Sequence, residues 1–321
     1  MKFNSKFKLY WGDLHSHCSI SYGEGKLEDA IKRAAGQLDF CSITGHAFWP
    51  DIDTLDSNYI EIKNYHKVGF KKLHNNWNKI INRLKKLETK HSIKIFPSYE
   101  WHSLKFGDHN IYSKNFDLKL IDAIDIKSLK QQLTKNNLMI PHHIGYGKNN
   151  RGINWDYFTE DFSPFVEIYS MHGCSVDEKN PFTMLHDMGT LKGSGSAISG
   201  WKKNKIFGII ASSDHHGGYP GSFENGMIAV LSKNKSKKEL WESFIKRRVY
   251  AVTGDKIKLS FKINNHEMGS IINNCNKRLI KIKAQSFSSL SQIIIYKNDI
   301  KYKIFNVISK KNIKKLIKGS L

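Results

Sequence analysis

Polar clusters rich in histidine follow apolar, strand-like runs at five places along the chain. The first, Tyr10-Trp-Gly-Asp-Leu-His-Ser-His17, places two imidazoles two residues apart at the end of such a run. Side chains at i and i+2 leave the same face of a strand, so both imidazoles can converge on one point. Imidazole binds divalent transition metals and a carboxylate can bridge two of them, so the pattern predicts a multinuclear metal site. The other clusters are Ser42-Ile-Thr-Gly-His46, Pro97-Ser-Tyr-Glu-Trp-His102, Ile140-Pro-His-His143 and Ala211-Ser-Ser-Asp-His-His216.

Predicted strands alternate with predicted helices over the first 255 residues. This alternation favours an α/β fold with a parallel, barrel-like sheet, in which the clusters meet at the carboxyl ends of the strands. Ligands and chemistry collect at that end of such barrels. Apolar spacing predicts helices over 27–35, 58–90, 126–135 and 237–248, and in a Gly- and Ser-rich region over 181–204. Strands are predicted over 9–17, 39–44, 93–99, 109–113, 138–141, 165–170 and 205–213.

The sequence pattern changes after residue 255. Apolar and polar side chains alternate with a period of two over 258–263, 279–283 and 293–299. Asn264-Asn265 and Asn298-Asp299 are typical of turns between such strands. We therefore predict a domain over residues 1–255 and a small antiparallel β extension over 256–321, which ends in a lysine-rich tail at 310–318.

The chain carries a formal charge of +22, from 51 lysines and arginines against 29 acidic residues. Few of the basic residues are arginine, the usual reader of base edges. The charge therefore favours a solvated lysine surface, or one that attracts a small anionic substrate, over sequence-specific nucleic-acid binding. No apolar run approaches the roughly 20 residues of a membrane span, and no signal sequence is evident, so we expect no membrane contact and a cytoplasmic location. The four cysteines form no CxxC pair, which excludes a typical zinc finger.

The ordered set of motifs resembles the PHP (polymerase and histidinol phosphatase) superfamily, in a PHP-like branch of unknown function. The resemblance covers residues 8 to about 255. It implies a distorted (β/α)7 TIM-like barrel, two or three divalent metal ions (Zn, Mn or Fe) and hydrolysis of phosphoesters. It rests on Trp11-Gly-Asp-Leu-His-Ser-His17, Tyr99-Glu-Trp101, Gly107-Asp-His-Asn110, Pro141-His-His143, Glu167-Ile-Tyr-Ser-Met-His-Gly173 and Ser212-Ser-Asp-His-His216.

The resemblance also assigns metal ligands position by position. Gly45 stands where the family has an aspartate, and Glu24 is the sole candidate at 21–24 for a further ligand, so two ions are favoured over three. The matched ligands are His15, His17, Glu100 and Asp214 for the first metal, with Glu100 bridging to the second, His109 and His143 for the second, and His46 and His216 for a third.

Other histidines have more than one interpretation. His142 and His143 are consecutive, so an extended strand would turn only one inward; both are candidate ligands, and His143 is favoured. His172 could bind metal or phosphate, and His143 and His172 are the predicted catalytic residues. The leaving group would be protonated by His172 or by whichever of His142 and His143 is not a ligand. His102 shares a strand face with Glu100. We expect His66, His74, His91, His186 and His266 at the surface, and Lys148, Arg151 and Lys202 as possible holders of phosphate oxygens.

Metal-assisted hydrolysis of a small phosphorylated substrate is the function that these residues predict. One alternative is an amidohydrolase-type enzyme that cleaves C–N or carboxylic ester bonds, and another is a non-catalytic metal-binding module. Glu100 stands where the former class commonly has a carbamylated lysine, and no polymerase segment accompanies the site in these residues. Both observations favour the phosphoesterase interpretation.

Overall fold

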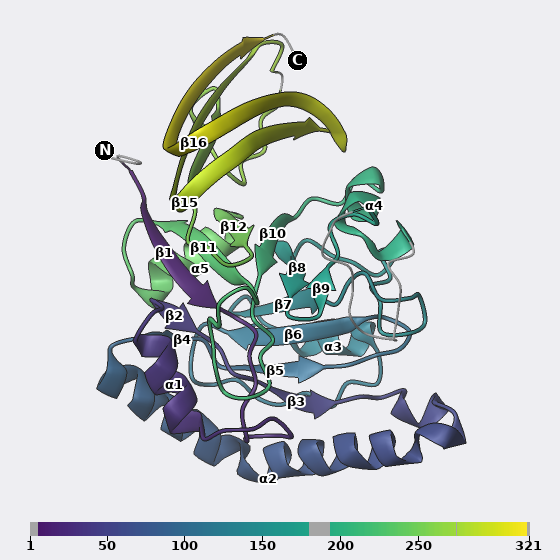
Figure 1. Cartoon of the computed structure of the whole chain (residues 1–321). Helices are drawn as coiled ribbons and strands as arrows, with labels where there is room; N and C mark the ends of the chain where they lie inside the picture. The colour runs from purple at the N-terminus through teal and green to yellow at the C-terminus, as the bar shows by residue number, and fades with distance from the viewer. Residues whose placement is uncertain (1–5, 180–192, 274, 320–321) are drawn as a thin grey trace.

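The computed structural model describes residues 6–179, 193–273 and 275–319. Its strands form four sheets. Three of them pack together and carry helices on their outer side, and the fourth stands beyond them at the end of the molecule that holds the C-terminus (Figure 1).

The first sheet has the strand order β12-β11-β1-β2-β4. β1 runs parallel to β2, and β2 parallel to β4, but β11 is antiparallel to both of its neighbours. The predicted all-parallel sheet is therefore wrong here, since β11 and β12 form an antiparallel pair that the sequence pattern did not reveal. The strands are β12 (Val249–Val252), β11 (Met227–Ser232), β1 (Lys8–Asp13), β2 (Phe40–Cys41) and β4 (Lys94–Ile95).

The second and third sheets are also mixed. In the second, of order β3-β5-β6-β7, only β3 and β5 are parallel. In the third, of order β10-β8-β9, β10 and β8 are parallel. Hydrogen bonding divides these strands into separate sheets, so the closed (β/α)7 barrel stays a prediction. Their bounds are β3 (Thr44–Phe48), β5 (Ser98–Trp101), β6 (Asp108–Ser113), β7 (Asn137–His142), β10 (Gly208–Ala211), β8 (Phe165–Ser170) and β9 (Gly173–Cys174).

The three sheets enclose an apolar core that lies beneath the polar strand ends. Neighbouring strands continue from sheet to sheet, because β7 lies beside β8 and β10 lies beside β12. Helix α5 (Lys237–Ile245) inserts Trp241 and Phe244 among inward-facing side chains such as Phe40, Phe96 and Phe165. This layer of aromatic side chains supports the strand ends from below.

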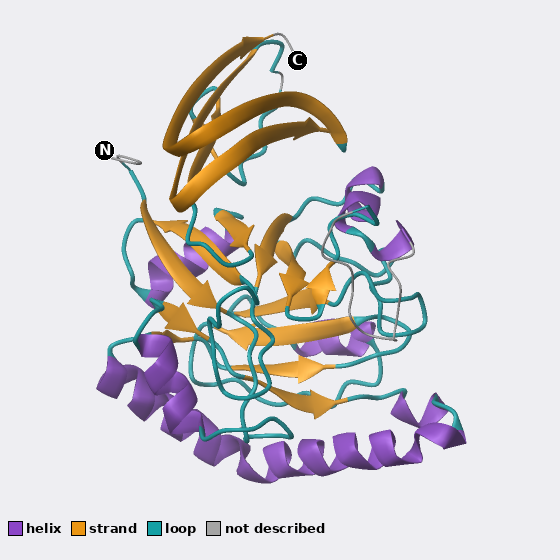
Figure 2. Cartoon of the chain, in the orientation of Figure 1, coloured by secondary structure: helices purple, strands orange, loops and turns teal. Residues whose placement is uncertain are grey.

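Helices cover the outer face of the sheets (Figure 2). The long helix α2 (Ile60–His91) buries residues such as Leu73, Trp77 and Leu84 at helical spacing, so one face packs on the sheets and the other carries lysines. α1 (Leu27–Ala35) packs beside it. The remaining helical segments are α3 (Ile126–Gln132), α4 (Ala197–Lys202) and the single turns Ile52–Thr54, Ser57–Tyr59 and Gly193–Gly195.

The fourth sheet is formed by residues after 257 and is antiparallel throughout, in the order β14-β13-β15-β16. Asn298 and Asp299 turn the long hairpin with φ values of 49° and 63°. The predicted antiparallel extension is confirmed as a sheet, whereas the domain boundary stays a prediction. The predicted tail at 310–318 is instead part of a strand. The strands are β14 (His266–Glu267), β13 (Lys258–Ile263), β15 (Arg278–Lys297) and β16 (Ile300–Gly319).

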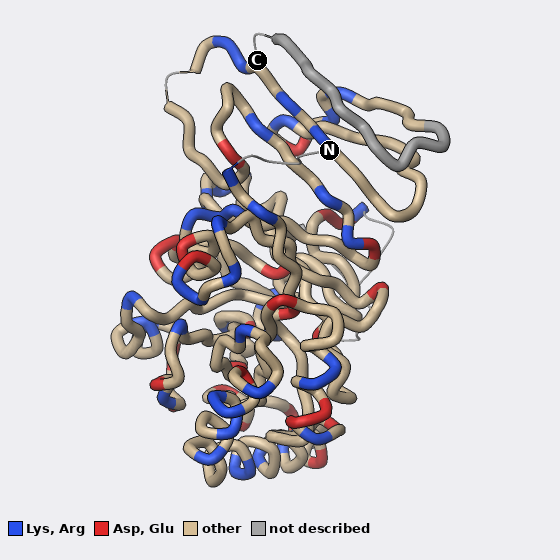
Figure 3. The backbone as a smooth tube through the Cα atoms, turned by 90° about the vertical axis from the view of Figure 1, so that its left-hand side faces the viewer, with Lys and Arg blue, Asp and Glu red and all other residues tan. Residues whose placement is uncertain are grey.

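Several predicted elements coincide with the observed ones. The helix at 27–35 and the strands at 165–170 and 258–263 have the predicted bounds. Of the predicted helical region 181–204, residues 181–192 lie outside the described part of the chain, and α4 occupies 197–202. Lysine and arginine are spread along the backbone from α2 to the fourth sheet (Figure 3). Over 6–179, 193–273 and 275–319, no helix has both the length and the apolar character that crossing a bilayer requires.

Candidate metal centre

A group of buried polar side chains meets where the strands of the three packed sheets end. They come from the strands β3, β5 and β7 and from the residues that follow β1, β5, β7, β8 and β10. Two of them are carboxylates, and the rest are imidazoles that surround these carboxylates. We call this group the histidine cluster: His15, His17, His46, Glu100, His102, His142, His143, His172, Asp214 and His216.

A parallel bridge joins the loops after β1 and β10, with Ser16 paired to His215. The N–H of Asp214 donates to the carbonyl of His15 at 2.7 Å, and the N–H of His17 donates to the carbonyl of His215 at 2.9 Å. Backbone pairing thus sets both imidazoles of the first motif beside Asp214. Asp214 itself has a φ of 51°, in the left-handed region that costs a non-glycine residue energy.

Asp13 connects the same two loops through hydrogen bonds of its buried side chain. Its carboxylate accepts hydrogen bonds from the Ser213 hydroxyl at 2.5 Å and from the backbone N–H groups of His15, Ser213 and Gly221 at 2.7–3.1 Å. Burial raises the pKa of Asp13 to about 6, although these hydrogen bonds oppose the shift. Asp13 therefore fixes the backbone of the site and is not among its facing side chains.

Asp214 is surrounded by five imidazoles, and four of them lie within 3.2 Å of its oxygens. Its Oδ1 lies 2.9 Å from His17 Nε2 and 3.1 Å from His15 Nε2. Its Oδ2 lies 3.1 Å from His143 Nε2 and 3.2 Å from His172 Nε2. One carboxylate thus connects the first motif to the ends of β7 and β8.

Glu100 has the same role on the opposite side of the cluster. Its Oε1 lies 2.7 Å from His142 Nε2, and its Oε2 lies 3.0 Å from His46 Nδ1. The same Oε2 is 3.5 Å from His17 Nε2 and 3.7 Å from His15 Nε2. The two carboxylates therefore share the first two imidazoles, as a bridged metal site requires.

Glu167 of β8 orients His15. Its two carboxylate oxygens lie 3.1 and 3.2 Å from His15 Nδ1, which donates to them when it carries the proton. The other ring nitrogen, Nε2, then faces Asp214 and Glu100 with its lone pair. A metal-binding histidine is usually oriented in this way, by a carboxylate that accepts a hydrogen bond from the ring nitrogen that does not bind the metal.

Buried oxygens in the cluster lack the hydrogen bonds that buried carboxylates normally have. Within the described residues, both Asp214 oxygens and Glu100 Oε2 are buried without a hydrogen-bond partner, although imidazole nitrogens lie 2.9–3.7 Å away. Two ligands that lie 2.0–2.2 Å from a tetrahedral ion are roughly 3.4 Å apart. The spacing and the imidazole and carboxylate donors therefore fit divalent transition metal ions.

Several triads of side chains bring their ligand atoms within 4.8 Å of one another. Glu100 belongs to three of them, and His17 and His46 each belong to two. A carboxylate can bridge two ions but a neutral imidazole binds one, so triads that share His17 or His46 are alternative, overlapping positions. They are His15–His17–Glu100, His46–Glu100–His102, Glu100–Asp108–His142, His143–His172–Asp214 and His17–His46–His216.

Three imidazoles of the cluster have a protonation state that suits metal binding. Burial, with the charge of His216, lowers the pKa of His17 to about 3, and burial also places the pKa values of His46 and His143 well below the usual range. These imidazoles are neutral at pH 7 and keep a lone pair. His15 differs from them: burial lowers its pKa, but the charges of Asp214 and Glu167 outweigh this effect and raise the pKa well above its usual value, so a metal at His15 Nε2 would displace a proton. Burial favours the protonated form of Asp214, but His15 and His172 outweigh it and hold the carboxyl pKa well below normal.

A cavity of about 420 Å³ opens onto the cluster. Tyr22 stacks on His46 with ring centres 3.7 Å apart, and Tyr146 stacks on His143 at 4.8 Å. Arg151 lines the same cavity. The cavity thus has an aromatic wall, a buried cation and the metal-binding atoms in one space.

Arg151 is anchored beside the cluster by a buried ion pair. Its Nε donates to Asp108 Oδ2 at 2.7 Å, and its Nη2 lies 3.1 Å from His102 Nδ1. Its guanidinium also lies over the ring of Trp49 at 5.1 Å. Of the residues predicted to hold phosphate, Arg151 lies at the cavity, whereas Lys202 pairs with Asp299 at 2.8 Å and Lys148 is exposed and is not among the cavity's lining residues.

The structure does not bring His109 to the cluster. β6 pairs with β5 so that His109 lies opposite Trp101, while the adjacent Asn110 lies opposite Glu100. His109 therefore takes the other face of the strand, where its Nδ1 lies 2.9 Å from the carbonyl of Gly107. The expected ligand position is corrected: Asp108, one residue earlier, faces the cluster and forms a triad with Glu100 and His142.

His142 and His143 both reach the cluster, which corrects the expectation that only one could face inward. His142 Nε2 contacts Glu100 and His143 Nε2 contacts Asp214. The strand β7 ends at His142, and His143 has a φ of 49°, so the strand alternation does not apply to it. His102 joins as well, with its Nε2 3.1 Å from His46 Nδ1.

The surface expectation for His66 is wrong. It lies on the inward face of α2, lines the cavity and packs its ring 5.1 Å from Trp49. His74 is half-buried, with Nε2 3.1 Å from the carbonyl of Ala47. His186 lies outside the described residues. Glu24 is exposed, and its backbone N–H donates to the carbonyl of His216.

Gly45, where the resembling family has an aspartate, is packed so closely that a side chain would displace its neighbours. A Cβ there would lie 2.8 Å from Leu73 Cδ1 of α2 and 3.1 Å from Ile20 Cδ1. α2 thus lies close against β3 at this position.

No family model matches the chain. It is similar to uncharacterized proteins of Chlamydia trachomatis and Chlamydia muridarum, each 31% identical over 155 residues, which are 45% of this chain and 25% of those proteins. An uncharacterized protein of Chlamydia pneumoniae is 28% identical over 187 residues, 55% of this chain and 29% of that protein. The chain thus spans about a quarter of the length of these curated relatives.

A solved structure similar to this one is a two-domain protein from Bacteroides vulgatus that contains a predicted PHP-like metal-dependent phosphoesterase. The similarity covers 98% of this chain and 87% of that chain, with a TM-score of 0.51 and 13% identity. At this identity the likeness establishes the fold alone: this chain shares the mixed α/β fold of that two-domain protein.

Proposed function

We propose that the chain is a metal-dependent hydrolase that cleaves phosphoester bonds, with two or three divalent ions held by the histidine cluster. The observation that carries the proposal is the pair of buried carboxylates, Glu100 and Asp214, which share His15 and His17 and open onto a cavity. The likeness to a structure that contains a predicted phosphoesterase supports it. We also infer that the three packed sheets correspond to a distorted (β/α)7 barrel over residues 1–255.

The ligand roles follow from the contacts. Glu100 would be shared by two ions, one held with His15 and His17 and the other with His46 and His142. Asp214 and His143 would complete the first set of ligands. When bound, divalent cations of the Zn, Mn or Fe type activate water and polarise a phosphoryl oxygen.

The remaining residues bind substrate and move a proton. Arg151 holds phosphoryl oxygens at the cavity, where a guanidinium suits an oxyanion. Burial lowers the pKa of His172, but the charge of Asp214 outweighs it, so this pKa lies above its usual value. His172 therefore keeps a proton near neutral pH and can give it to the leaving oxygen. Amidohydrolase-type sites commonly contain a carbamylated lysine. No lysine is found among the described residues that line the cavity, so a phosphoester is favoured over an amide as the substrate.

Metal analysis coupled to a substrate panel tests the proposal. The purified chain is measured for bound metals, stripped with a chelator, and reloaded with Zn, Mn or Fe. Each form is assayed with p-nitrophenyl phosphate, its bis-ester, a carboxylic ester and an amide. We expect phosphoester hydrolysis that disappears with chelation and returns with metal, and that is lost in Asp214→Asn without unfolding. Full activity of the stripped protein, or cleavage of the amide alone, would overturn it.

A further inference from the structure

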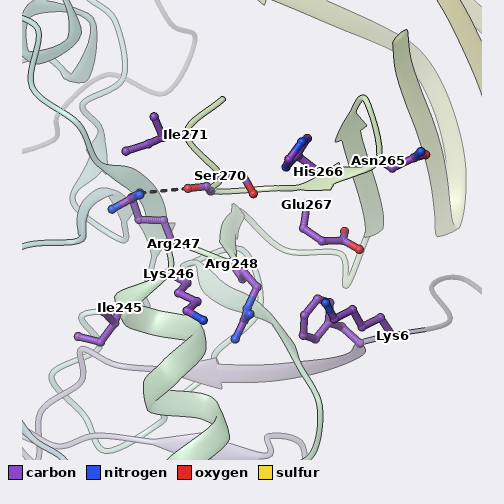
Figure 4. Close-up of a pocket in the computed structure, with 12 residues that line it drawn as sticks. Lys6, Ile245, Lys246, Arg247, Arg248, Asn265, His266, Glu267, Ser270 and Ile271 are labelled. Atoms are coloured by element: carbon purple, nitrogen blue, oxygen red, sulfur yellow. Dashed lines mark hydrogen bonds between the residues drawn. The ribbon is translucent and has the colours of Figure 1, made fainter. Parts of the chain in front are cut away.

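A second pocket, of about 470 Å³, lies where the start of the chain, the end of α5 and the segment 265–271 meet (Figure 4). Its basic residues are Lys6, Lys246, Arg247 and Arg248. Lys6 precedes β1, whose far end leads to the histidine cluster. A strand of six residues is roughly 20 Å long, so this pocket is separate from the candidate metal centre.

Three cations gather on one side of this pocket. Lys246 Nζ and Arg248 Nη2 lie 3.1 and 3.6 Å from the same oxygen, Oε1 of Glu242. The Arg248 guanidinium lies 4.5 Å and Lys6 Nζ lies 5.5 Å from the centre of the Phe7 ring. Glu267, which also lines the pocket, is paired with Lys262 at 2.6 Å. The lining of the pocket thus carries Lys6, Lys246, Arg247 and Arg248 against one carboxylate, Glu267, and the pocket is electropositive.

Arg248 also has donor capacity that the fold does not use. Its Nη2 donates to the Ser243 hydroxyl at 3.1 Å. Its Nε, in contrast, is buried and has no hydrogen-bond partner among the described residues, and the residue as a whole is 8% exposed. A buried donor without an acceptor is unfavourable, and an oxyanion beside the guanidinium supplies the acceptor.

An apolar crevice of about 670 Å³ adjoins the basic pocket and shares Arg247, Gly269, Ser270 and Ile271 with it. It lies between β10 and β12 of the packed sheets and the inner face of the fourth sheet, where Leu259, Ile282 and Ile293 line it. These shared residues form the wall common to both pockets, where Arg247 Nε donates to the carbonyl of Gly269 at 3.3 Å. Gly269 has a φ of 86°, and a Cβ there would meet Arg247 O at 2.4 Å. The crevice has the size of a small-molecule site.

We propose that the basic pocket and the apolar crevice together bind an amphipathic anion, an alkyl or acyl chain that carries a phosphate. The phosphate lies against Lys6, Lys246 and Arg248, and the hydrocarbon chain lies in the crevice. A small inorganic anion would leave the crevice unused, and an uncharged apolar ligand would supply no acceptor to the buried Nε of Arg248. This site does not depend on the proposed hydrolysis.

Titration of the chelator-treated full chain with n-alkyl phosphates, below their micellar concentrations, tests the proposal. Affinity should rise by up to about fourfold for each methylene that enters the crevice. Decyl phosphate should therefore bind at least 100-fold more tightly than inorganic phosphate. Decyltrimethylammonium, with the same chain and the opposite charge, should not bind saturably. An affinity that is independent of chain length, or equal binding of the cationic amphiphile, overturns the proposal.

Variants locate the binding. Lys246 and Ile271 are exposed, with 61% of the Lys246 side chain and 58% of Ile271 accessible, so Lys246→Glu and Ile271→Asp should fold normally. Each should weaken decyl phosphate binding at least tenfold. Lys85→Glu on the exposed face of α2 makes the same charge change elsewhere and should leave it unchanged. The proposed site would be refuted if Lys246→Glu and Lys85→Glu weakened decyl phosphate binding equally. It would also be refuted if Asp214→Asn alone weakened this binding, because the ligand would then bind elsewhere.

Discussion

Glu167 holds His15 from a different sheet, with both carboxylate oxygens 3.1–3.2 Å from Nδ1 of the imidazole. This contact joins β8 to the loop after β1. It determines which nitrogen of His15 is available to a metal, because Nε2 then faces Asp214 at 3.1 Å. The orientation of the ligand is therefore part of the protein's own structure.

Glu167→Gln should weaken metal binding without abolishing the fold. The amide keeps the shape and its oxygen can still accept a hydrogen bond from Nδ1–H, but it loses the charge that makes His15 a stronger ligand. Metal affinity should fall by roughly 10- to 100-fold, as for other partners behind metal-binding histidines. Competition with a chromogenic chelator measures it. Glu61→Gln, at an exposed position in the first turn of α2, is the matched control. Equal affinities in the two variants would show that Glu167 has no orienting role.

Arg151→Lys should impair substrate binding more than metal binding. Arg151 is the sole lysine or arginine among the described residues that line the cavity, and lysine keeps its charge but loses the planar donor fork. We expect KM for a phosphoester to rise about tenfold, with the metal content unchanged. Steady-state kinetics on the metal-loaded protein separate KM from kcat. An unchanged KM would remove Arg151 from the substrate site.

The chelated protein should lose stability as the pH falls from about 6.5 towards 3. Burial lowers the pKa of His109 to about 3, so the folded state resists a proton that the unfolded chain takes up near pH 6.5. The stabilising contribution is complete above pH 6.5 and decreases by up to about 1.4 kcal/mol for each pH unit below it. His109→Gln should make the pH dependence of urea unfolding shallower. An identical slope in this variant would contradict the burial of a neutral His109.

Phe244→Ala should destabilise the protein by about 3–5 kcal/mol, because it leaves a cavity in the core beneath the site. Phe244 is 1% exposed, with its ring 5.2 Å from Phe96 and 5.7 Å from Phe40. Denaturant unfolding gives the change in free energy. Phe287→Ala, at a side chain that is 86% exposed on β15, should change stability by less than about 0.5 kcal/mol. Similar losses in both variants would mean that α5 does not fill the core as described.

Elements with a regular local pattern could be predicted from the sequence. The helix at 27–35 has apolar residues at helical spacing, and the strand at 258–263 has a clean period of two. β11 could not be separated from its surroundings, because a fully buried strand has no alternation. Its antiparallel pairing with β1 depends on contacts across more than 200 residues of sequence.

In the candidate site, too, features with a local sequence pattern could be predicted, whereas features set by contacts between distant residues could not. The motifs identified the histidines after β1 and at the end of β7, since these stand at strand ends. His109 was placed on the wrong face because one residue of register decides between it and Asp108. Glu167 was missed as the partner of His15 because a contact between distant strands has no local signature. The left-handed φ of His143 is likewise set by tertiary structure.

The metal content of Glu100→Gln, measured beside the wild type, tests the central claim most directly. The substitution preserves shape but removes the charge that two ions share. After metal loading, the wild type should hold two or three divalent ions per chain and the variant at least one fewer. Phosphoester turnover should fall by roughly 100-fold or more. Wild-type metal content and turnover in Glu100→Gln would contradict the account, because the histidine cluster would then not be the active site.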